Sequence, residues 1–396
     1  MSKAPKSQPA CPSCTGSRTF DFYHIDRVPV HSCVLLDSEE ESLGYPRHRI
    51  DLYFCRDCGF IFNAAFQPEL VDYTQPYEDQ QAFSPTFAAF ATALARRLVE
   101  KHSLYGKTLI EIGCGKGDFL AELCRLGENW GIGIDPAVRA DRIPADVAWR
   151  IQCIPEYFSQ NHLSLRGDFV CCRHTLEHVP HTLEFVRRIF SLSDHNPPAP
   201  VFVEVPDTLR VLKELAFWDI YYEHCSYFTA ASLRHLFAKV GFEVLEVKLA
   251  YGDQYLLLEA VPGRPGKSLP PEANEVGMLE AAARRFSVEV AEKIQGWREI
   301  IRGLVRDGKK LAIWGAGSKA VGFLTTLGLD DEVQALVDIN PFRQGRYLPG
   351  FGKKILAPEE LREYRPDVVI AMNPLYRTEI AGELERLGLT AEVLAV

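Results

Sequence analysis

Residues 219–229, DIYYEHCSYFT, concentrate acid, imidazole and phenol side chains within a few positions of one another. Histidine titrates near neutrality and is the commonest general base, and an adjacent glutamate or tyrosine can orient its ring. A second segment, CRHTLEHV, carries His174 and His178. The alternative for each histidine is a hydrogen-bonded imidazole packed in the interior. This alternative is least favoured for His224, because its sequence neighbours are the most polar. The two segments therefore indicate candidates for proton transfer, among which the surroundings of His224 are the most suggestive.

A glycine-rich loop, EIGCGKG, begins at Glu111 and contains Gly113, Gly115 and Gly117. Glycines at alternate positions let the backbone turn tightly and approach a ligand that a Cβ would exclude. The helical segment that follows offers free N–H groups to the same ligand. Asp135 stands at the end of the next strand-like segment, where an acid can accept hydrogen bonds from ribose hydroxyls. The alternative is an ordinary turn followed by an incidental acid.

The spacing of these glycines distinguishes between cofactors. Dinucleotide-binding proteins use G-x-G-x-x-G over a pyrophosphate, whereas this loop has the form G-x-G-x-G after an acidic strand end. It resembles motif I of the class I methyltransferases. In that family the loop lies along S-adenosylmethionine (SAM), and the downstream acid binds the ribose.

Four cysteines form two Cys-x-x-Cys pairs near the N-terminus, Cys11 with Cys14 and Cys55 with Cys58. Two such pairs supply the four thiolates of a closed, tetrahedral structural zinc site, and the alternative is a set of unrelated thiols in a reduced protein. We expect the stretch that joins the pairs to be polar and irregular. Three further candidate ligands lie within it: His24, His31 and Cys33.

The elements that must position these side chains alternate between strand-like and helical segments. Apolar residues recur at three- and four-residue spacing over residues 84–102, which predicts a helix that covers one side of a sheet. Strand-like segments follow at residues 107–113, 129–135, 168–174 and 200–207, with a helix at 118–127 and helical stretches between the later ones. This alternation favours a doubly wound parallel sheet, and residues 241–261 read as a terminal hairpin.

The C-terminal part repeats the alternation after a Pro/Gly-rich linker, PGRPGKSLPPEAN. A long helical pattern covers about residues 275–307, followed by the strand-like LAIWG and the turn GAGSKA. The turn resembles a nucleotide-binding loop, and Asp338 ends the next strand-like segment. A second cofactor site is one interpretation. We favour the other, in which this part packs over the active site and shapes it.

Composition narrows the class of protein. The chain has 396 residues, a net charge of −9, 47% hydrophobic and 24% charged residues, which is typical of a globular enzyme of two or three domains. The acidic balance argues against a nucleic-acid binder, and no apolar run could span a bilayer. The first residues lack the apolar core of a secretory signal, so we expect a cytoplasmic protein, as a monomer or homodimer, with a small-molecule substrate.

These motifs together resemble the nucleotide-sugar C-methyltransferases of deoxysugar biosynthesis over almost the whole chain. That family has an N-terminal four-cysteine zinc module, a class I methyltransferase core and a C-terminal Rossmann-like domain. The matching segments are CPSC, CRDC, DYTQPYED, EIGCGKG, EVPD, YYEHCSYFT, WGAGSKA and VDINPFRQGRYLPG. The resemblance implies an α/β fold divided into residues 1–70 (zinc module), 71–263 (core), 264–305 (linker and long helix) and 306–396 (C-terminal domain).

The resemblance also implies a reaction, the methylation of a carbon next to a keto group on a nucleotide-linked sugar. His224 would remove the proton, Glu223 would hold the ring, and Tyr221 or His178 would donate a hydrogen bond to the oxygen as it gains charge. Tyr77 would face the substrate. Besides the structural zinc, the cofactor is SAM.

Two positions depart from the family pattern. His174, which we place among the cofactor-binding residues, stands where members that bind a thymidine-linked sugar have asparagine. Tyr222, a candidate substrate contact, stands where a histidine is frequent. An O- or N-methyltransferase of a small natural product remains an alternative, as does a non-catalytic zinc-ribbon adaptor with a degenerate core. A dehydrogenase built on Gly315 and Gly317 lacks the third glycine.

Overall fold

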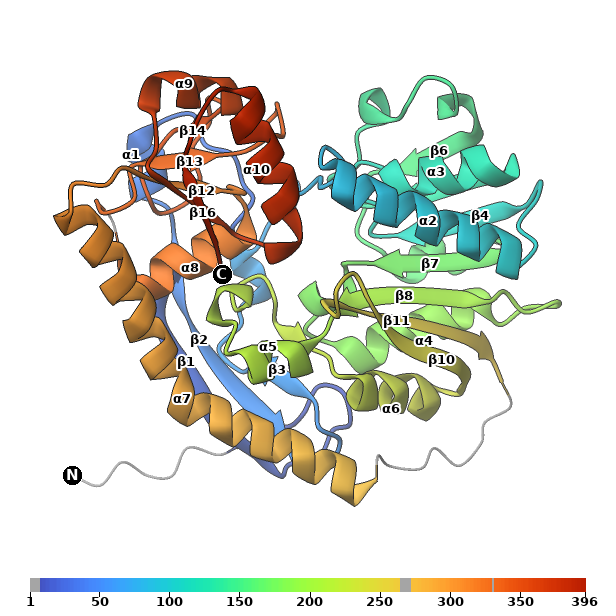
Figure 1. Ribbon diagram of the computed structural model, residues 1–396. Helices are drawn as coiled ribbons and strands as arrows, with labels where there is room; N and C mark the ends of the chain where they lie inside the picture. Colours follow the sequence, from blue (N-terminus) through green and yellow to red (C-terminus); the bar gives the residue numbers. More distant parts are fainter. Residues whose placement is uncertain (1–7, 264–271, 330) are drawn as a thin grey trace.

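The computed structural model describes residues 8–263, 272–329 and 331–396. The described elements form three sheets, which belong to an N-terminal module, a central core and a C-terminal domain (Figure 1). Most of the linker predicted over PGRPGKSLPPEAN falls on residues 264–271, outside the described residues. None of the described helices is long and apolar enough to cross a membrane.

The N-terminal module is a sheet of order β1-β2-β3-β9. Its strands are β1 (Thr19–Pro29), β2 (Arg47–Cys55), β3 (Ile61–Asn63) and β9 (Ser226–Tyr227), and the short helix α1 (Glu39–Leu43) joins β1 to β2. The prediction of an irregular stretch between the cysteine pairs was therefore wrong. Alternating apolar residues in TFDFYHIDRVP and RHRIDLYFC form a long antiparallel pair, a period-two pattern that polar composition obscured.

The fourth strand of this sheet comes from the core. Strand β9 pairs antiparallel with β3, with Ile61 opposite Tyr227 and Phe62 opposite Ser226. Because β9 begins two residues after His224, the module and the histidine segment belong to one continuous sheet edge. A boundary at residue 70 therefore does not separate all of the module from the core.

The core is a seven-stranded sheet of order β10-β11-β8-β7-β4-β5-β6. Strand β11 is antiparallel to both its neighbours, and the remaining neighbours run parallel to one another. The strands are β4 (Thr108–Ile112), β5 (Trp130–Ile134), β6 (Ile151–Ile154), β7 (Phe169–Arg173), β8 (Val201–Pro206), β10 (Phe242–Ala250) and β11 (Tyr255–Pro262). The predicted doubly wound, class I methyltransferase core is confirmed, including its terminal hairpin.

Helices cover both faces of the core sheet. Helices α2 (Pro85–Lys101) and α3 (Asp118–Gly127) pack on one face, and α4 (Thr182–Ser193) and α6 (Ala230–Val240) on the other. Helix α2 begins as the sequence predicts, because the Ser84 side chain caps it by accepting a hydrogen bond from the backbone N–H of Phe87. The short α5 (Thr208–Glu214) follows β8.

The C-terminal domain is a parallel sheet of order β14-β13-β12-β15-β16. Its elements are β12 (Leu311–Trp314), α8 (Ser318–Leu327), β13 (Ala335–Val337), β14 (Ile355–Leu356), α9 (Leu361–Tyr364), β15 (Val368–Ala371), α10 (Arg377–Arg386) and β16 (Glu392–Ala395). The long helix α7 (Ala273–Arg306) runs from the core along β1 to this domain (Figure 1).

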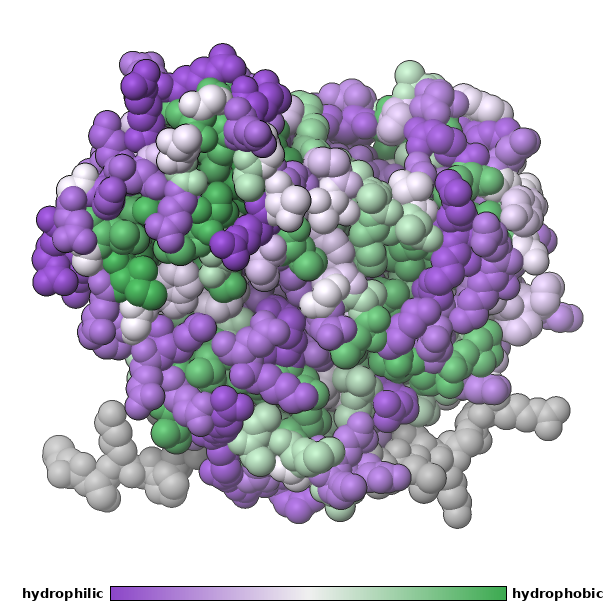
Figure 2. Space-filling view, viewed as in Figure 1, coloured by the Kyte–Doolittle hydropathy of each residue, from purple (hydrophilic) through white to green (hydrophobic). Residues whose placement is uncertain are grey.

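The N-terminal module, the core and the C-terminal domain pack directly against one another. One buried apolar cluster includes residues of β1, α5, α7, α8 and β12. On the face shown in Figure 2, hydrophilic side chains cover both the C-terminal domain and the core, and weakly polar or apolar ones lie along the seam between them. This packing fixes how the C-terminal domain faces the core.

Candidate active site

A cavity of about 1000 Å³ lies where the carboxyl ends of the core strands face the C-terminal domain. Small-molecule sites commonly measure about 300–1,000 Å³, so this cavity has room for a cofactor and a substrate together. Its wall includes Cys33 of the N-terminal module, Gly115 and His224 of the core, and Lys319 of the C-terminal domain, so all three parts of the chain contribute. The carboxyl edge of a doubly wound sheet is where ligands bind in this class of fold.

The glycine loop between β4 and α3 forms one wall of the cavity. Gly113, Gly115 and Gly117 all have positive φ, at 69°, 53° and 85°. A Cβ at Gly113 would meet the Thr175 hydroxyl oxygen at 1.9 Å, whereas one at Gly115 would meet nothing closer than 3.9 Å. Gly113 and Gly115 line the cavity, whereas Gly117, the N-cap of α3, does not, and a Cβ there would meet Cδ1 of Ile143 at 2.2 Å. The loop therefore presents bare backbone to whatever occupies the cavity.

Two acids border this loop, as the sequence predicts. Asp135 accepts hydrogen bonds from the backbone N–H groups of Gly115 at 3.0 Å and Ala137 at 2.7 Å, and it lines the cavity. Burial raises the pKa of Glu111 to about 8, although the nearby Arg173 opposes the shift. Oε2 of Glu111 has no hydrogen-bond partner, which leaves a buried acceptor at the cavity.

His224 lies in the same cavity, in contact with two aromatic residues. The hydroxyl oxygen of Tyr221 lies 2.8 Å from Nε2 of His224. The ring of His178 has its centroid 4.9 Å from that of His224, and its Nδ1 lies 2.7 Å from the Tyr73 hydroxyl oxygen. All four side chains line the cavity. The structure therefore brings the two histidine segments of the sequence together.

Both imidazoles are held in their neutral form. Burial lowers the pKa of His178 below its ordinary value, and Glu177 opposes the shift. Burial also lowers the pKa of His224, well below its ordinary value. The positive charges of His174 and Lys319, and any proton that His178 takes up, lower the pKa of His224 further. A neutral imidazole can accept a proton, which a general base requires.

Glu223 does not hold His224, contrary to the sequence prediction. Its carboxylate accepts hydrogen bonds from the backbone N–H of Ser32 at 2.7 Å and from the Ser32 hydroxyl. Burial raises the pKa of Glu223 to about 7, and hydrogen bonds from Ser32 and Tyr77 oppose the shift. The Ser32 hydroxyl in turn contacts the Ser318 hydroxyl at 2.9 Å. Glu223 thus joins the histidine segment to the N-terminal module and, through Ser32, to α8.

Tyr222 does not contact the cavity either, so its prediction as a substrate contact was wrong. Its side chain is 1% exposed and packs against His48 and Phe66 in the apolar core. Its hydroxyl accepts a hydrogen bond from the backbone N–H of Gln67 at 2.8 Å. The neighbouring Tyr221 does line the cavity. Tyr77, the other predicted tyrosine, lines the cavity.

His174 lines the cavity beside a buried acid. Its Nε2 lies 3.3 Å from Oε1 of Glu204, and its ring packs edge-on against Tyr255 with centroids 4.6 Å apart. Burial acts to lower the pKa of His174, but Glu204 and Glu177 outweigh it and raise the pKa to about 9. His174 is therefore a cation at neutral pH.

Several cavity residues escaped the sequence reasoning. Tyr73 and Asp79 lie within DYTQPYED, and Lys319 lies within WGAGSKA, so the quoted motifs contained them without a chemical signal. Arg210 follows EVPD and carries no motif. Each becomes recognisable only once the fold closes the cavity.

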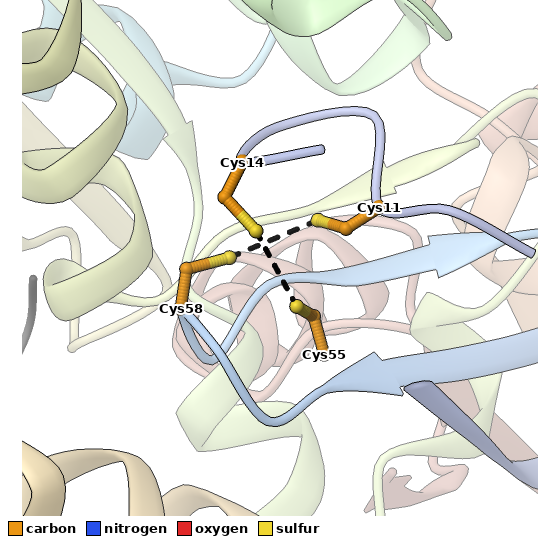
Figure 3. A group of neighbouring side chains, drawn as sticks. All are labelled: Cys11, Cys14, Cys55 and Cys58. Atoms are coloured by element: carbon orange, nitrogen blue, oxygen red, sulfur yellow. Dashed lines mark hydrogen bonds between the residues drawn. The ribbon is translucent and has the colours of Figure 1, made fainter. Parts of the chain in front are cut away.

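The two cysteine pairs converge on a single cluster (Figure 3). The four sulfur atoms lie within 4.8 Å of one another, with 3.7 Å between Cys11 and Cys58 and 3.5 Å between Cys14 and Cys55. A tetrahedron with Zn–S bonds of about 2.3 Å places its sulfur atoms about 3.8 Å apart. The three competing ligands lie elsewhere, because His24 pairs with Asp51, His31 contacts Tyr45, and Cys33 contacts Ser318.

Comparisons with known proteins agree with this architecture. Residues 85–247 match the model of a methyltransferase domain, and residues 271–390 match that of a C-methyltransferase C-terminal domain. The chain is 28% identical to the C-methyltransferase NovU of Streptomyces niveus, over 93% of this chain and 90% of that one.

Two of the similar solved structures each cover less than half of this chain. A magnesium protoporphyrin IX methyltransferase from Synechocystis is 20% identical over 45% of this chain and 84% of its own, with a TM-score of 0.33. An O-methyltransferase family protein from Burkholderia thailandensis is 18% identical over 46% of this chain and 59% of its own, with a TM-score of 0.36.

The sheet order and the glycine loop define a class I SAM-dependent methyltransferase. The matches to both domain models and to a relative over nearly the full length show that the chain is similar to C-methyltransferases.

Proposed function

We propose that this enzyme methylates a carbon next to a keto group of a nucleotide-linked sugar, with His224 as the general base. The observation that carries the proposal is the contact of His224 with Tyr221, in the cavity that also contains the glycine loop. The assignment of a nucleotide-linked sugar as the substrate rests on the sequence resemblance. The similarity to a C-methyltransferase supports methylation at carbon.

SAM, when bound, supplies the methyl group. The residues around the loop fit it: Gly113 and Gly115 leave backbone exposed, Asp135 offers a carboxylate for ribose hydroxyls, and Oε2 of Glu111 is an unpaired acceptor for a cationic amine. A cationic His174 lines the same cavity, where it is placed to pair with the carboxylate of the cofactor or with an anionic group of the substrate.

His224 removes the proton beside the ketone, which leaves an enolate whose carbon is the nucleophile. Tyr221 positions the ring, because its hydroxyl meets Nε2 and Glu223 is engaged with Ser32. The low pKa keeps His224 unprotonated before the reaction. His178 and Tyr73 stand beside the reacting pair as hydrogen-bonding partners for the substrate oxygen.

We propose that Cys11, Cys14, Cys55 and Cys58 hold a structural zinc ion. The sulfur spacing fits a tetrahedron with no position left for a substrate. The cluster does not line the cavity. The role of the zinc site is therefore structural: it holds β2 and β3 in place.

Methylation at oxygen or nitrogen is the competing function. It requires a base but no carbon acid, so the same imidazole could serve it. Methylation at carbon is favoured because two neutral histidines and two tyrosines lie in one buried wall. These side chains can accept the proton of a carbon acid and donate hydrogen bonds to the oxygen of its enolate.

His224→Ala tests the base. We expect unchanged affinity for S-adenosylhomocysteine by calorimetry, because the glycine loop is intact, and a methyl-transfer rate about 10²–10⁴-fold lower. His195→Ala is the matched control, since His195 contacts the backbone oxygen of Gly167 away from the cavity. Turnover of His224→Ala equal to that of the control would remove His224 from the role.

A further inference from the structure

The GAGSKA turn of the C-terminal domain opens into the same cavity as the glycine loop. The ends of β12, β13 and β15 contribute Gly315, Asp338 and Asn373 to the cavity wall. The carboxyl edges of two separate parallel sheets therefore face one another across a single space. A ligand that extends from the histidines toward the C-terminal domain must pass along α8.

This turn is closed to a second dinucleotide. Nη1 of Arg343 donates hydrogen bonds to the backbone oxygen of Ala316 at 2.8 Å and to Oδ2 of Asp338 at 3.0 Å. A Cβ at Gly317 would meet the same Nη1 at 2.8 Å. The guanidinium thus fills the space against the turn, and it neutralises the acid that would bind a ribose. The interpretation of GAGSKA as a second cofactor site is therefore not favoured.

The start of α8 remains available at the cavity. Gly317 is its N-cap and offers no side-chain acceptor, so the first N–H groups of this ten-residue helix lack an internal partner. Gly317, Ser318 and Lys319 all line the cavity. An uncapped helix start favours a negative charge in front of it.

Two buried cations stand beside this helix start. Nζ of Lys319 lies 3.1 Å from Oδ1 of Asp219 and 3.0 Å from the side-chain oxygen of Gln254. Arg210 contacts the other oxygen of Asp219 and also reaches the exposed Glu214 at 2.8 Å. The Arg210 side chain is 10% exposed and lines the cavity, and its Nε has no hydrogen-bond partner in the part of the chain that the structure describes.

Charge at this point of the cavity is therefore positive. Lys319 and Arg210 share the buried carboxylate of Asp219, and the second partner of Arg210, Glu214, is 56% exposed and does not line the cavity, so two cations and one carboxylate face the cavity beside the positive end of α8. Lys319 is 24% exposed, which leaves it accessible to a ligand in the cavity. An anion there would receive a charge-assisted hydrogen bond in a largely desolvated wall.

The position of this wall relative to His224 is fixed by packing. Helix α8 packs on residues 217–219, and a Cβ at Gly322 would meet the backbone oxygen of Trp218 at 2.7 Å, so the two backbones are in close contact. The histidine segment follows directly at Tyr221. The charge of Lys319 is close enough to lower the pKa of His224.

We propose that Lys319, Arg210 and the start of α8 form an anion subsite that holds the diphosphate of the nucleotide-linked substrate. The inference rests on the proposed function, because it assigns one part of that substrate. In a nucleotide sugar the diphosphate is attached to the sugar ring. The site of the diphosphate must therefore lie about one sugar ring away from His224, the general base. The wall described here belongs to the same cavity as His224 and to a helix that packs on residues 217–219, just before the histidine segment, and the nucleoside would then extend along the C-terminal domain.

Calorimetric titration of the zinc-loaded enzyme, saturated with S-adenosylhomocysteine, tests the subsite with dTDP, UDP, inorganic pyrophosphate and thymidine. The wild-type enzyme is expected to bind a nucleoside diphosphate more tightly than thymidine, with an affinity that falls as salt rises. Lys319→Gln is expected to raise the Kd of that nucleoside diphosphate at least about tenfold. Lys319→Arg is expected to restore most of the affinity.

Lys309→Gln is the matched control, because Lys309 is exposed, belongs to the same domain and pairs with Asp367. Unchanged affinity of Lys319→Gln for S-adenosylhomocysteine shows that the variant is folded. If wild type and Lys319→Gln bind a nucleoside diphosphate equally, the subsite is overturned and the proposed function stands. If the wild type binds none of the diphosphates, the sugar-nucleotide substrate class is overturned together with the subsite.

Discussion

At the scale of single residues, the most informative pair is Tyr221 and Tyr222, which are adjacent in sequence and have different surroundings. Tyr221 faces the cavity and meets His224, and Tyr222 is buried in the apolar core with its hydroxyl on the backbone of Gln67. The same separation applies to Glu223 and His224. In this short irregular segment, Tyr221 and His224 line the cavity, whereas Tyr222 and Glu223 between them bind Gln67 and Ser32 of the surrounding structure.

Replacing each tyrosine by phenylalanine separates the two roles. Tyr221→Phe removes one hydrogen bond to His224, so we expect a methyl-transfer rate about tenfold lower at saturating cofactor and little change in the free energy of unfolding. Tyr222→Phe leaves the Gln67 amide without its acceptor, so we expect a loss of about 1 kcal/mol of stability with the rate retained. Rate assays and denaturant unfolding measure the pair. A larger rate loss in Tyr222→Phe than in Tyr221→Phe contradicts this assignment.

At the scale of elements, the cysteine cluster is connected to the histidine segment through two short strands. Cys55 ends β2, Cys58 lies in the turn, and β3 follows and pairs with β9. The backbone N–H of Asn63 donates to the oxygen of Cys225, the residue directly after His224. A metal that holds this turn therefore also holds the chain on which the base stands.

Cys58→Ser is expected to lower bound zinc well below one ion per chain and to reduce the free energy of unfolding by more than about 2 kcal/mol. Amide hydrogen exchange should quicken at residues 61–63 and 225–227, because β3 and β9 lose their anchor. Cys124→Ser is the matched control, since Cys124 is a buried thiol of α3 outside the cluster. Full zinc content in Cys58→Ser, or exchange unchanged from the control, contradicts the connection.

The sequence indicates part of this arrangement and not the rest, for physical reasons. The core follows from local patterns: alternating apolar and glycine signals place β4, the loop, α3 and β5 where they are observed. The strands β1 and β2 were missed because charged residues interrupt their alternation. The partners of Glu223 and Tyr222 were wrong because they depend on Ser32 and Gln67, far away in the sequence. Lys319 and Arg210 meet only through Asp219, a contact that no local pattern contains.

At the scale of the whole molecule, the cavity exists because three parts close on one another. The core contributes the glycine loop and His224, the N-terminal module contributes Cys33, and the C-terminal domain contributes Lys319. No single part encloses the space: the methyltransferase domain match ends at residue 247, and the wall continues to Glu379. Activity is therefore expected to need all three parts of the chain, and the reaction proposed for the cavity is the formation of a carbon–carbon bond.

Transfer of a ¹³C-labelled methyl group tests that claim most directly. The zinc-loaded enzyme is incubated with methyl-labelled SAM and a panel of nucleotide-linked keto sugars, and the product is examined by carbon–proton correlation NMR. The account predicts a labelled methyl group bonded to the carbon next to the ketone, with the proton of that carbon lost. A label on oxygen or nitrogen, or no transfer to any of these sugars while cofactor binding is intact, would contradict it.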